Sequence, residues 1–269
     1  MKYAHIVPTM YLEMFDKYNT MHLVLAQHIG KDQDYTDFYR STDIYKILDN
    51  GAYENGYPVP IEELVEKALL IAADEIIIPD VFMNCDETLK HLEASLAYLN
   101  KTKLTNDFKL MVAPQGKTNA EYMKCLGVMQ ATREVSVIGL SFLVVAQCFQ
   151  EITACLDVLP NRQMLTKLIQ LLGFHDKQYH LLGLGNCKEL EYQKQYPWIR
   201  GGDSSSAFMH GSNRIRFQPA KGLVVERIKT KLNFQMKDQL NDERITDIQH
   251  NMEVINAFAG NDSDKEDIN

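Results

Sequence analysis

Short apolar runs alternate with longer helical patterns along most of this chain, and this alternation constrains the fold more than any other feature. The clearest run is Glu75–Pro79, whose three consecutive isoleucines are typical of a strand buried on both faces. The other strand candidates are His22–His28, Asp43–Asp49, Phe108–Ala113, Val135–Leu140, Tyr179–Leu184, a short run that ends near Gly202, and Leu223–Ile228.

Helical patterns lie between these runs, namely Pro60–Ala73, Asp86–Asn100, Asn119–Thr132, Arg162–Leu172 and Lys237–Ala259. Pro60 and the two glutamates after it suit a first helical turn, Asp86 is a candidate cap, and Gly173 is a good stop. Seven or eight strand–helix units in 269 residues predict an α/β fold of the (β/α)8 TIM-barrel type.

We expect one barrel domain over residues 1–259, followed by an acidic, disordered tail over residues 260–269. The alternative fold is a doubly wound open sheet. Such a sheet normally carries a glycine-rich phosphate loop after its first strand, and residues 22–31 contain no loop of that kind.

The composition favours a cytoplasmic protein that binds no membrane. No apolar run reaches the roughly 18–20 residues that cross a bilayer, and the N-terminus lacks a basic segment followed by an apolar core. The five cysteines form no CxxC pair, so reduced thiols are expected. The histidines show no metal-ligand spacing, so we expect no metal, and His180 is interpreted as surface or satisfied core.

The formal net charge of −8 argues against a strongly basic nucleic-acid-binding protein, but the charge is uneven. The window 194–231 holds two acidic side chains and eight basic ones: Lys194, Arg200, Arg214, Arg216, Lys221, Arg227, Lys229 and Lys231. This local excess fits a phosphate-binding surface, and it also fits a solvated face paired with acids from elsewhere.

Polar residues follow several of the expected strands, where a barrel places its chemistry. They are Asp49, Asp80, Gln115 and Asp203. A single aspartate in such a place is commonly a turn former or a helix cap, but four polar residues in equivalent places predict a shared pocket. Two carboxylates can serve as nucleophile and general acid/base at an anomeric carbon, and an aspartate with a glutamine suits the edge of guanine.

The strings LDNGAY, IPDV–NCDET, APQGKT, VIGLSF, LLGLGN and RGGDSSSA, in this order, resemble the tRNA-guanine transglycosylase superfamily over about residues 22 to 210. The resemblance implies that Asp49 is the general acid/base and that Asp203 is the nucleophile. It also implies that the base is bound by Asp80, Gln115 and the backbone of Gly139 and Leu140.

The chain differs from the tRNA-modifying members of this superfamily in three ways. The tRNA enzymes carry a zinc site of three cysteines and one histidine near the C-terminus, whereas this chain has no cysteine after Cys187. The chain is also shorter, and it reads DSSSA at Asp203 instead of a DMFD-like string. It therefore looks like the short, phage-type DpdA branch, which inserts 7-deazaguanine bases into DNA and so protects the DNA from host restriction.

The resemblance implies that Asp203 attacks C1′ of a deoxyguanosine, that guanine leaves, and that preQ0 or a derivative takes its place. No cofactor is expected. Tyr53 or Phe82 would stack on a base that has left the helix, at a cost of a few kcal/mol. The residues expected to hold the flanking phosphates are Lys194, Arg200, Arg214, Arg216 and Lys221.

Three alternatives stay open. The acceptor can be tRNA, the chain can be a non-catalytic partner subunit, or the barrel can act on a small nucleoside or sugar. The presence of both Asp49 and Asp203 argues against a subunit without catalysis. The sequence leaves a homodimer open, and a phage-encoded enzyme would work in the host cytoplasm.

Overall fold

The computed structural model describes residues 1–184, 186–218 and 230–260. Eight parallel strands form one sheet in the order β1-β8-β7-β6-β5-β4-β3-β2. The strands are β1 (Lys2–His5), β2 (His22–Leu25), β3 (Lys46–Asp49), β4 (Glu75–Ile77), β5 (Lys109–Val112), β6 (Val135–Ser141), β7 (Gln178–Leu182) and β8 (Ile199–Ser204).

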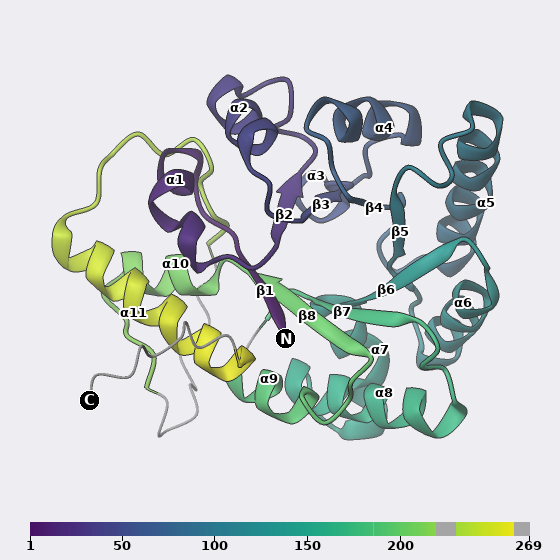
Figure 1. The fold of residues 1–269 in the computed structure, drawn as a ribbon. Helices are drawn as coiled ribbons and strands as arrows, with labels where there is room; N and C mark the ends of the chain where they lie inside the picture. Colours follow the sequence, from purple (N-terminus) through teal and green to yellow (C-terminus); the bar gives the residue numbers. More distant parts are fainter. Residues whose placement is uncertain (185, 219–229, 261–269) are drawn as a thin grey trace, which may run out of the picture.

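The sheet curls into a nearly closed barrel, which confirms the predicted (β/α)8 TIM-type fold (Figure 1). The two edge strands, β1 and β2, meet through the residues that precede β2. The backbone N–H of Tyr3 donates to Thr20 Oγ1 at 2.7 Å, and the backbone N–H of Thr20 donates to the Tyr3 carbonyl at 3.1 Å.

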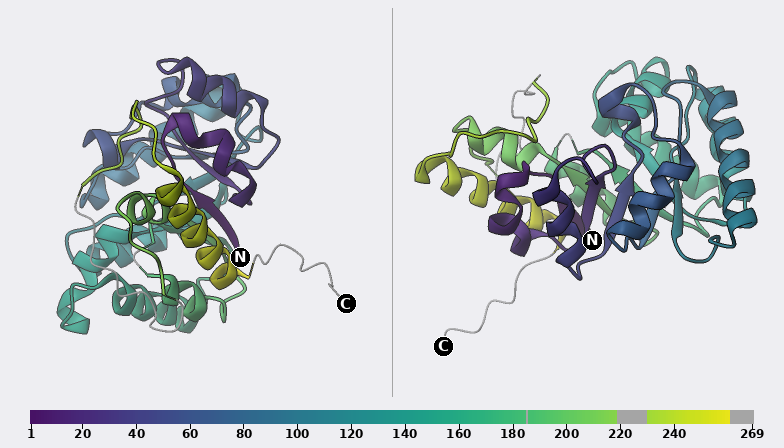
Figure 2. Two further views of the ribbon diagram at one scale, coloured as in Figure 1. Left: turned by 90° about the vertical axis from the view of Figure 1, so that its left-hand side faces the viewer. Right: turned by 90° about the horizontal axis from the view of Figure 1, so that it is seen from above.

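Helices follow the strands and cover the outside of the barrel (Figures 1 and 2). They are α1 (Leu12–Phe15), α2 (Gln33–Ser41), α3 (Ala52–Asn55), α4 (Ile61–Leu70), α5 (Cys85–Thr102), α6 (Asn119–Ala131), α7 (Phe142–Thr153), α8 (Val158–Leu172), α9 (Cys187–Gln193), α10 (Ser206–Ser212) and α11 (Asp242–Ala259). Two short 3-10 helices, η1 (Thr9–Tyr11) and η2 (Asp16–Tyr18), flank α1.

Seven predicted strands correspond to β2–β8, and the five predicted helices correspond to α4, α5, α6, α8 and α11. The eighth strand of the barrel is β1, which the sequence reading missed because its four residues, KYAH, form no apolar run. The predicted strand Leu223–Ile228 and residues 261–269 of the predicted tail lie outside the described residues.

Local capping residues explain several helix boundaries. The Asn84 side chain accepts a hydrogen bond from the backbone N–H of Glu87 and so caps α5, while Asp86, the expected cap, lies inside the first turn. Thr118 caps α6 in the same way, and Gly173 ends α8 with a φ of 71°. The turn chemistry therefore fixes where the helices start and stop.

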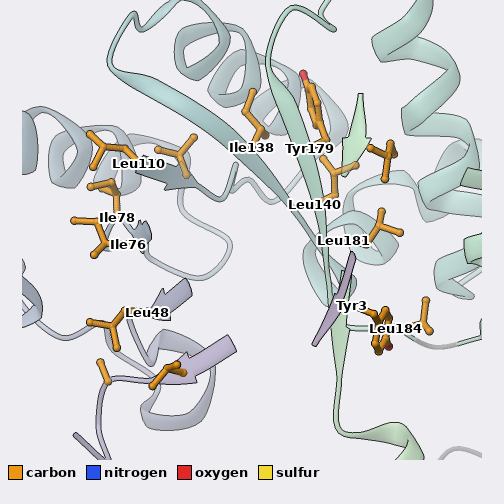
Figure 3. Packing of buried hydrophobic residues seen from close by; sticks show 14 of the residues in the cluster. Tyr3, Leu48, Ile76, Ile78, Leu110, Ile138, Leu140, Tyr179, Leu181 and Leu184 are labelled. Atoms are coloured by element: carbon orange, nitrogen blue, oxygen red, sulfur yellow. The ribbon is translucent and has the colours of Figure 1, made fainter. Parts of the chain in front are cut away.

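The apolar side chains form two layers, because alternate residues of each strand point to opposite faces. One layer fills the barrel and consists of Ala4, Met21, Leu23, Ile47, Ile77, Met111 and Val137. The other lies between the barrel and the helices, where Figure 3 shows Ile76, Ile78 and Leu110 side by side. Of the three successive isoleucines, Ile77 therefore lies in the inner layer, and Ile76 and Ile78 lie in the outer layer.

An ion pair crosses the barrel interior at the amino-terminal ends of the strands. Arg200 on β8 donates two hydrogen bonds of 2.6 Å to the carboxylate of Glu75 on β4. These strands are not neighbours in the sheet, so the contact spans the interior. The Tyr45 hydroxyl donates to the same carboxylate at 2.7 Å. We call these three residues the floor of the barrel.

No single helix of the described residues is long and apolar enough to cross a bilayer. Only α7 and α8 taken together reach the required length and composition, and the pair is bent by 83°.

Candidate active site

The predicted polar residues lie at the carboxyl-terminal ends of the strands. Asp49 is the last residue of β3, and Asp80 and Gln115 follow β4 and β5. Asp203 lies near the end of β8, beside Ala4 of β1. In (β/α)8 enzymes this end of the barrel carries the active site.

Asp80 and Gln115, which the sequence places in one pocket, are in direct contact. The Gln115 amide donates to Asp80 Oδ2 at 2.6 Å, and its carbonyl oxygen accepts from the backbone N–H of Met83 at 3.0 Å. Asn50, which the sequence reading did not single out, donates to Asp80 Oδ1 at 2.7 Å. Both carboxylate oxygens are therefore fixed, and each keeps a lone pair for a ligand.

Burial raises the pKa of Asp80 to about 6, and the hydrogen bonds from Asn50 and Gln115 oppose this rise. The side chain is therefore mainly ionised at neutral pH. A buried carboxylate held by two amides is suited to accept hydrogen bonds from a flat ligand.

Asp49 differs from Asp80 in its proton affinity. Burial raises the pKa of Asp49 well above its usual range, and the charges of Glu54, Asp80 and Asp203 raise it further. A hydrogen bond from the backbone of Gly51 opposes these effects. This environment favours the protonated form, which is the form that a general acid needs.

Asp203 accepts two hydrogen bonds in the described part of the chain. His180 Nε2 on β7 lies 3.0 Å from Asp203 Oδ1, and the backbone N–H of Gly183 donates to Oδ2 at 3.2 Å. Burial is the largest cause that lowers the pKa of His180. The imidazole is therefore neutral at neutral pH, and the contact with an Asp203 oxygen assigns the ring proton to Nε2.

A buried ion pair fixes the peptide that contacts Asp203. Arg162 of α8 donates to the carbonyl of Gly183 at 2.5 Å and to that of Leu140 at 2.9 Å. Its Nε lies 2.6 Å from Glu189 Oε1, and both side chains are almost fully buried. The sequence reading missed Arg162 and Glu189, because each lies within a helical segment and gives no strand-end signal.

A cavity of about 930 Å³ opens at this end of the barrel. Leu25 and Leu184, close to the ends of β2 and β7, line it together with Ser204 and with Glu54 of α3. The Glu54 Oε2 atom is buried and has no hydrogen-bond partner within the described ranges. Asp49, Asp80, Gln115 and Asp203 do not themselves line the cavity, which borders Asp203 through the next residue of the chain, Ser204.

Of the two aromatic candidates, Tyr53 lines this cavity and Phe82 does not. Tyr53 lines the cavity with 57% of its surface exposed, and Lys231 Nζ lies 5.2 Å from its ring centre. Phe82 follows Asp80 by two residues and is 50% exposed. Both rings are accessible to a ligand, as stacking requires.

Gly139 and Leu140 lie on β6. A side chain on Gly139 would meet Leu182 Cδ1 at 2.5 Å, so the barrel interior is closely packed at this point. The Leu140 side chain belongs to the outer apolar layer, and its carbonyl already accepts a hydrogen bond from Arg162. The predicted backbone contacts to a base remain an expectation.

The predicted phosphate-binding residues do not gather around Asp203. Arg200 lies in the floor, and Lys194 lies at the same end, where burial and then its charge lower the pKa of the Met1 amino group. Arg214 and Arg216 both contact Asp247 of α11, at 3.2 and 2.5 Å. Lys221 lies outside the described residues. Arg200, Arg214 and Arg216 are thus paired with acids, and Lys194 lies at the amino-terminal end of the barrel.

Within residues 1–184, 186–218 and 230–260, no group of three or more histidine, cysteine, aspartate or glutamate side chains could hold a metal ion. No family model matches the chain, and no curated protein matches it either. The functional assignment therefore depends on the motif resemblance and on the geometry of these carboxylates.

Proposed function

We propose that this protein is a transglycosylase that exchanges guanine in DNA for a 7-deazaguanine base, preQ0 or a derivative. The observation that carries the proposal is the meeting of Asp49, Asp80 and Asp203 at the carboxyl-terminal end of the barrel, each in a different environment. Asp49 favours its protonated form, Asp80 is held by two amides, and Asp203 is held by a histidine and a backbone N–H.

In the first half-reaction, a carboxylate oxygen of Asp203 forms a bond to C1′ of the target deoxyguanosine. The bond from C1′ to N9 of guanine breaks, its electron pair goes to the base, and Asp49 donates a proton to the leaving guanine. The product is a covalent aspartyl-nucleotide. The raised pKa of Asp49 supports this role, because the acid must hold its proton before the bond breaks.

In the second half-reaction, the Asp49 carboxylate takes the N9 proton of the incoming base. The base nitrogen forms a bond to C1′, and the bond from Asp203 to C1′ breaks. Asp49 is then protonated again and Asp203 is again a free carboxylate, so the protein returns to its starting state.

Asp80 and Gln115 supply the selectivity for guanine-like bases. A carboxylate can accept hydrogen bonds from N1–H and from the 2-amino group, both of which adenine lacks. The side-chain amides of Asn50 and Gln115 each donate a hydrogen bond to a different oxygen of the Asp80 carboxylate. The fixed carboxylate therefore presents its remaining lone pairs to the base in one orientation.

A nucleic-acid acceptor fits the size of the cavity. About 930 Å³ exceeds what a single base needs and suits a nucleotide that has left the helix. Tyr53 and Lys231 at the opening provide a ring and a cation for such a nucleotide. DNA is proposed as the acceptor because the chain lacks the zinc-ligand cysteines of the tRNA enzymes. The proposed role is protection of phage DNA from restriction in the host cytoplasm.

The test is base exchange by the purified protein with duplex DNA, single-stranded DNA or tRNA and radiolabelled guanine or preQ0. Asp203→Asn and Asp49→Asn are compared with Asp86→Asn, a matched control because Asp86 is exposed and pairs with Lys124 on the surface. We expect label to enter DNA, and only the two site variants to lose the activity. Label in tRNA alone would move the acceptor to tRNA, and no label in any nucleic acid would overturn the proposal.

A further inference from the structure

His180 carries an inference that rests on the proposed function but concerns a residue that the motif resemblance does not assign. His180 lies on β7 with no exposed surface, and its Nε2 lies 3.0 Å from Asp203 Oδ1. It is the only side chain with a hydrogen bond to Asp203 in the described part of the chain.

The register of the barrel explains this contact. His180 on β7 lies opposite Gly201 on β8, and Asp203 follows Gly201 by two residues. Residues two apart on a strand point to the same face, so His180 and Asp203 both point toward the interior. The contact therefore follows from the strand pairing and does not depend on a loop.

The charged groups that act on His180 come from two strands, with Asp203 and Arg200 on β8 and Glu75 on β4. Arg200 is held by Glu75 through two hydrogen bonds in the floor of the barrel. His180 Nδ1 is buried and has no hydrogen-bond partner within the described ranges. No carboxylate therefore contacts the far side of the ring, unlike the arrangement in which a histidine acts as a base.

We propose that His180 is a positioning residue for the nucleophile. Its neutral ring donates the Nε2 hydrogen bond that, with the Gly183 N–H, fixes the plane of the Asp203 carboxylate toward C1′ of the nucleotide. The same donor stabilises the carboxylate when it leaves C1′ in the second half-reaction. His180 transfers no proton, because a neutral imidazole N–H is a very weak acid.

Two substitutions separate this role from a packing role. His180→Gln keeps an N–H donor of similar reach, and His180→Met keeps the bulk without a donor. We expect His180→Met to lower kcat for base exchange about 100-fold, the typical loss for one preorganised donor, with KM for the base changed less than about threefold. His180→Gln is expected to restore kcat to within about tenfold of the wild type.

The rescue by the conservative variant is the readout that packing alone would not give. Both variants keep the bulk of the side chain, so a difference in kcat between His180→Gln and His180→Met reports the hydrogen-bond donor. Thermal unfolding of both variants shows whether a loss of rate reflects a loss of fold.

NMR of the wild-type protein tests the proposal without any variant. The ¹⁵N shifts of His180 are expected to show a neutral ring protonated on Nε2 at pH 7. A ring protonated on Nδ1 overturns the proposal, and so does a folded His180→Met with wild-type kcat or a His180→Gln as slow as His180→Met. A wild type that transfers no label to any nucleic acid overturns the proposed function itself, which is a separate result.

Discussion

At the amino-terminal end of the barrel the Glu75 carboxylate is bound by Arg200, whereas at the carboxyl-terminal end Asp49, Asp80 and Asp203 gather without such a partner. Within the described residues no arginine or lysine donates a hydrogen bond to any of these three aspartates. Amides, a neutral histidine and backbone N–H groups hold them instead. Opposite charges are matched in the floor, whereas the carboxyl-terminal end gathers acids. Burial raises the pKa of two of them, Asp49 and Asp80, and raised carboxyl pKa values are typical of sites of proton transfer.

The largest effect on stability is expected in the floor. Glu75→Gln leaves the buried Arg200 guanidinium without an opposite charge, which should lower the free energy of unfolding by about 3 kcal/mol. The rate of base exchange per folded molecule should change by less than about threefold, because the floor lies at the opposite end of the barrel from Asp49 and Asp80. Urea unfolding and rate measurements check both statements.

A double variant, Glu75→Met with Arg200→Met, is the control. Removal of both charges should recover much of the lost stability, because no uncompensated charge stays buried. If the single variant is as stable as the wild type, or if it loses most of its exchange rate, the distinction between the two ends of the barrel is wrong.

Arg162 sharpens the comparison, because it forms a buried ion pair with Glu189 at the carboxyl-terminal end of the barrel. Arg162→Lys keeps the charge but cannot reach the carbonyls of Leu140 and Gly183 together with Glu189. We expect a loss of about 2 kcal/mol in stability and a loss of about tenfold in exchange rate, since Gly183 then holds Asp203 less firmly. An unchanged rate in the folded variant would make this pair purely structural, like the floor.

The sequence predicted the parts of this arrangement that depend on local pattern. Seven strands and the places of Asp49, Asp80, Gln115 and Asp203 follow from apolar runs and the residues that end them. Strand β1 has no such run. The spacing of the histidines indicates a surface or satisfied core residue at His180, whereas its proposed role depends on a contact with Asp203, 23 residues away, that the strand register creates.

The basic residues of the window 194–231 also depend on contacts that the sequence does not show. The sequence counts charges but does not show their partners, and Arg200 finds its partner 125 residues earlier in the chain. Arg216 pairs with Asp247, which comes 31 residues later. Of the two interpretations that the window allowed, pairing with acids from elsewhere describes Arg200, Arg214 and Arg216.

Asp80 gives a prediction for ligand binding. Its pKa of about 6 means that the carboxylate becomes protonated as the pH falls below 6, and the protonated group accepts fewer hydrogen bonds. KM for the base should therefore rise by about tenfold per pH unit below this point. In Gln115→Met one donor that lowers the pKa is lost, so the rise should begin at higher pH. A KM that stays constant between pH 7 and pH 5 contradicts this role of Asp80.

The smallest effect on stability is expected at Asp49, and its sign is opposite to that in the floor. Because the pKa of Asp49 is higher in the folded than in the unfolded state, its contribution to stability is complete below the unfolded pKa of about 4 and decreases as the pH rises. Asp49→Asn removes this loss and keeps an acceptor for the Gly51 N–H. The variant should be more stable than the wild type by about 1 kcal/mol at pH 8 and less so at pH 5, by urea unfolding. Its exchange activity should be lost at both pH values. A gain in stability together with this loss would show that Asp49 contributes to the reaction and destabilises the fold. A variant that is less stable than the wild type at pH 8 would instead place Asp49 with Glu75 among the residues that hold the barrel together.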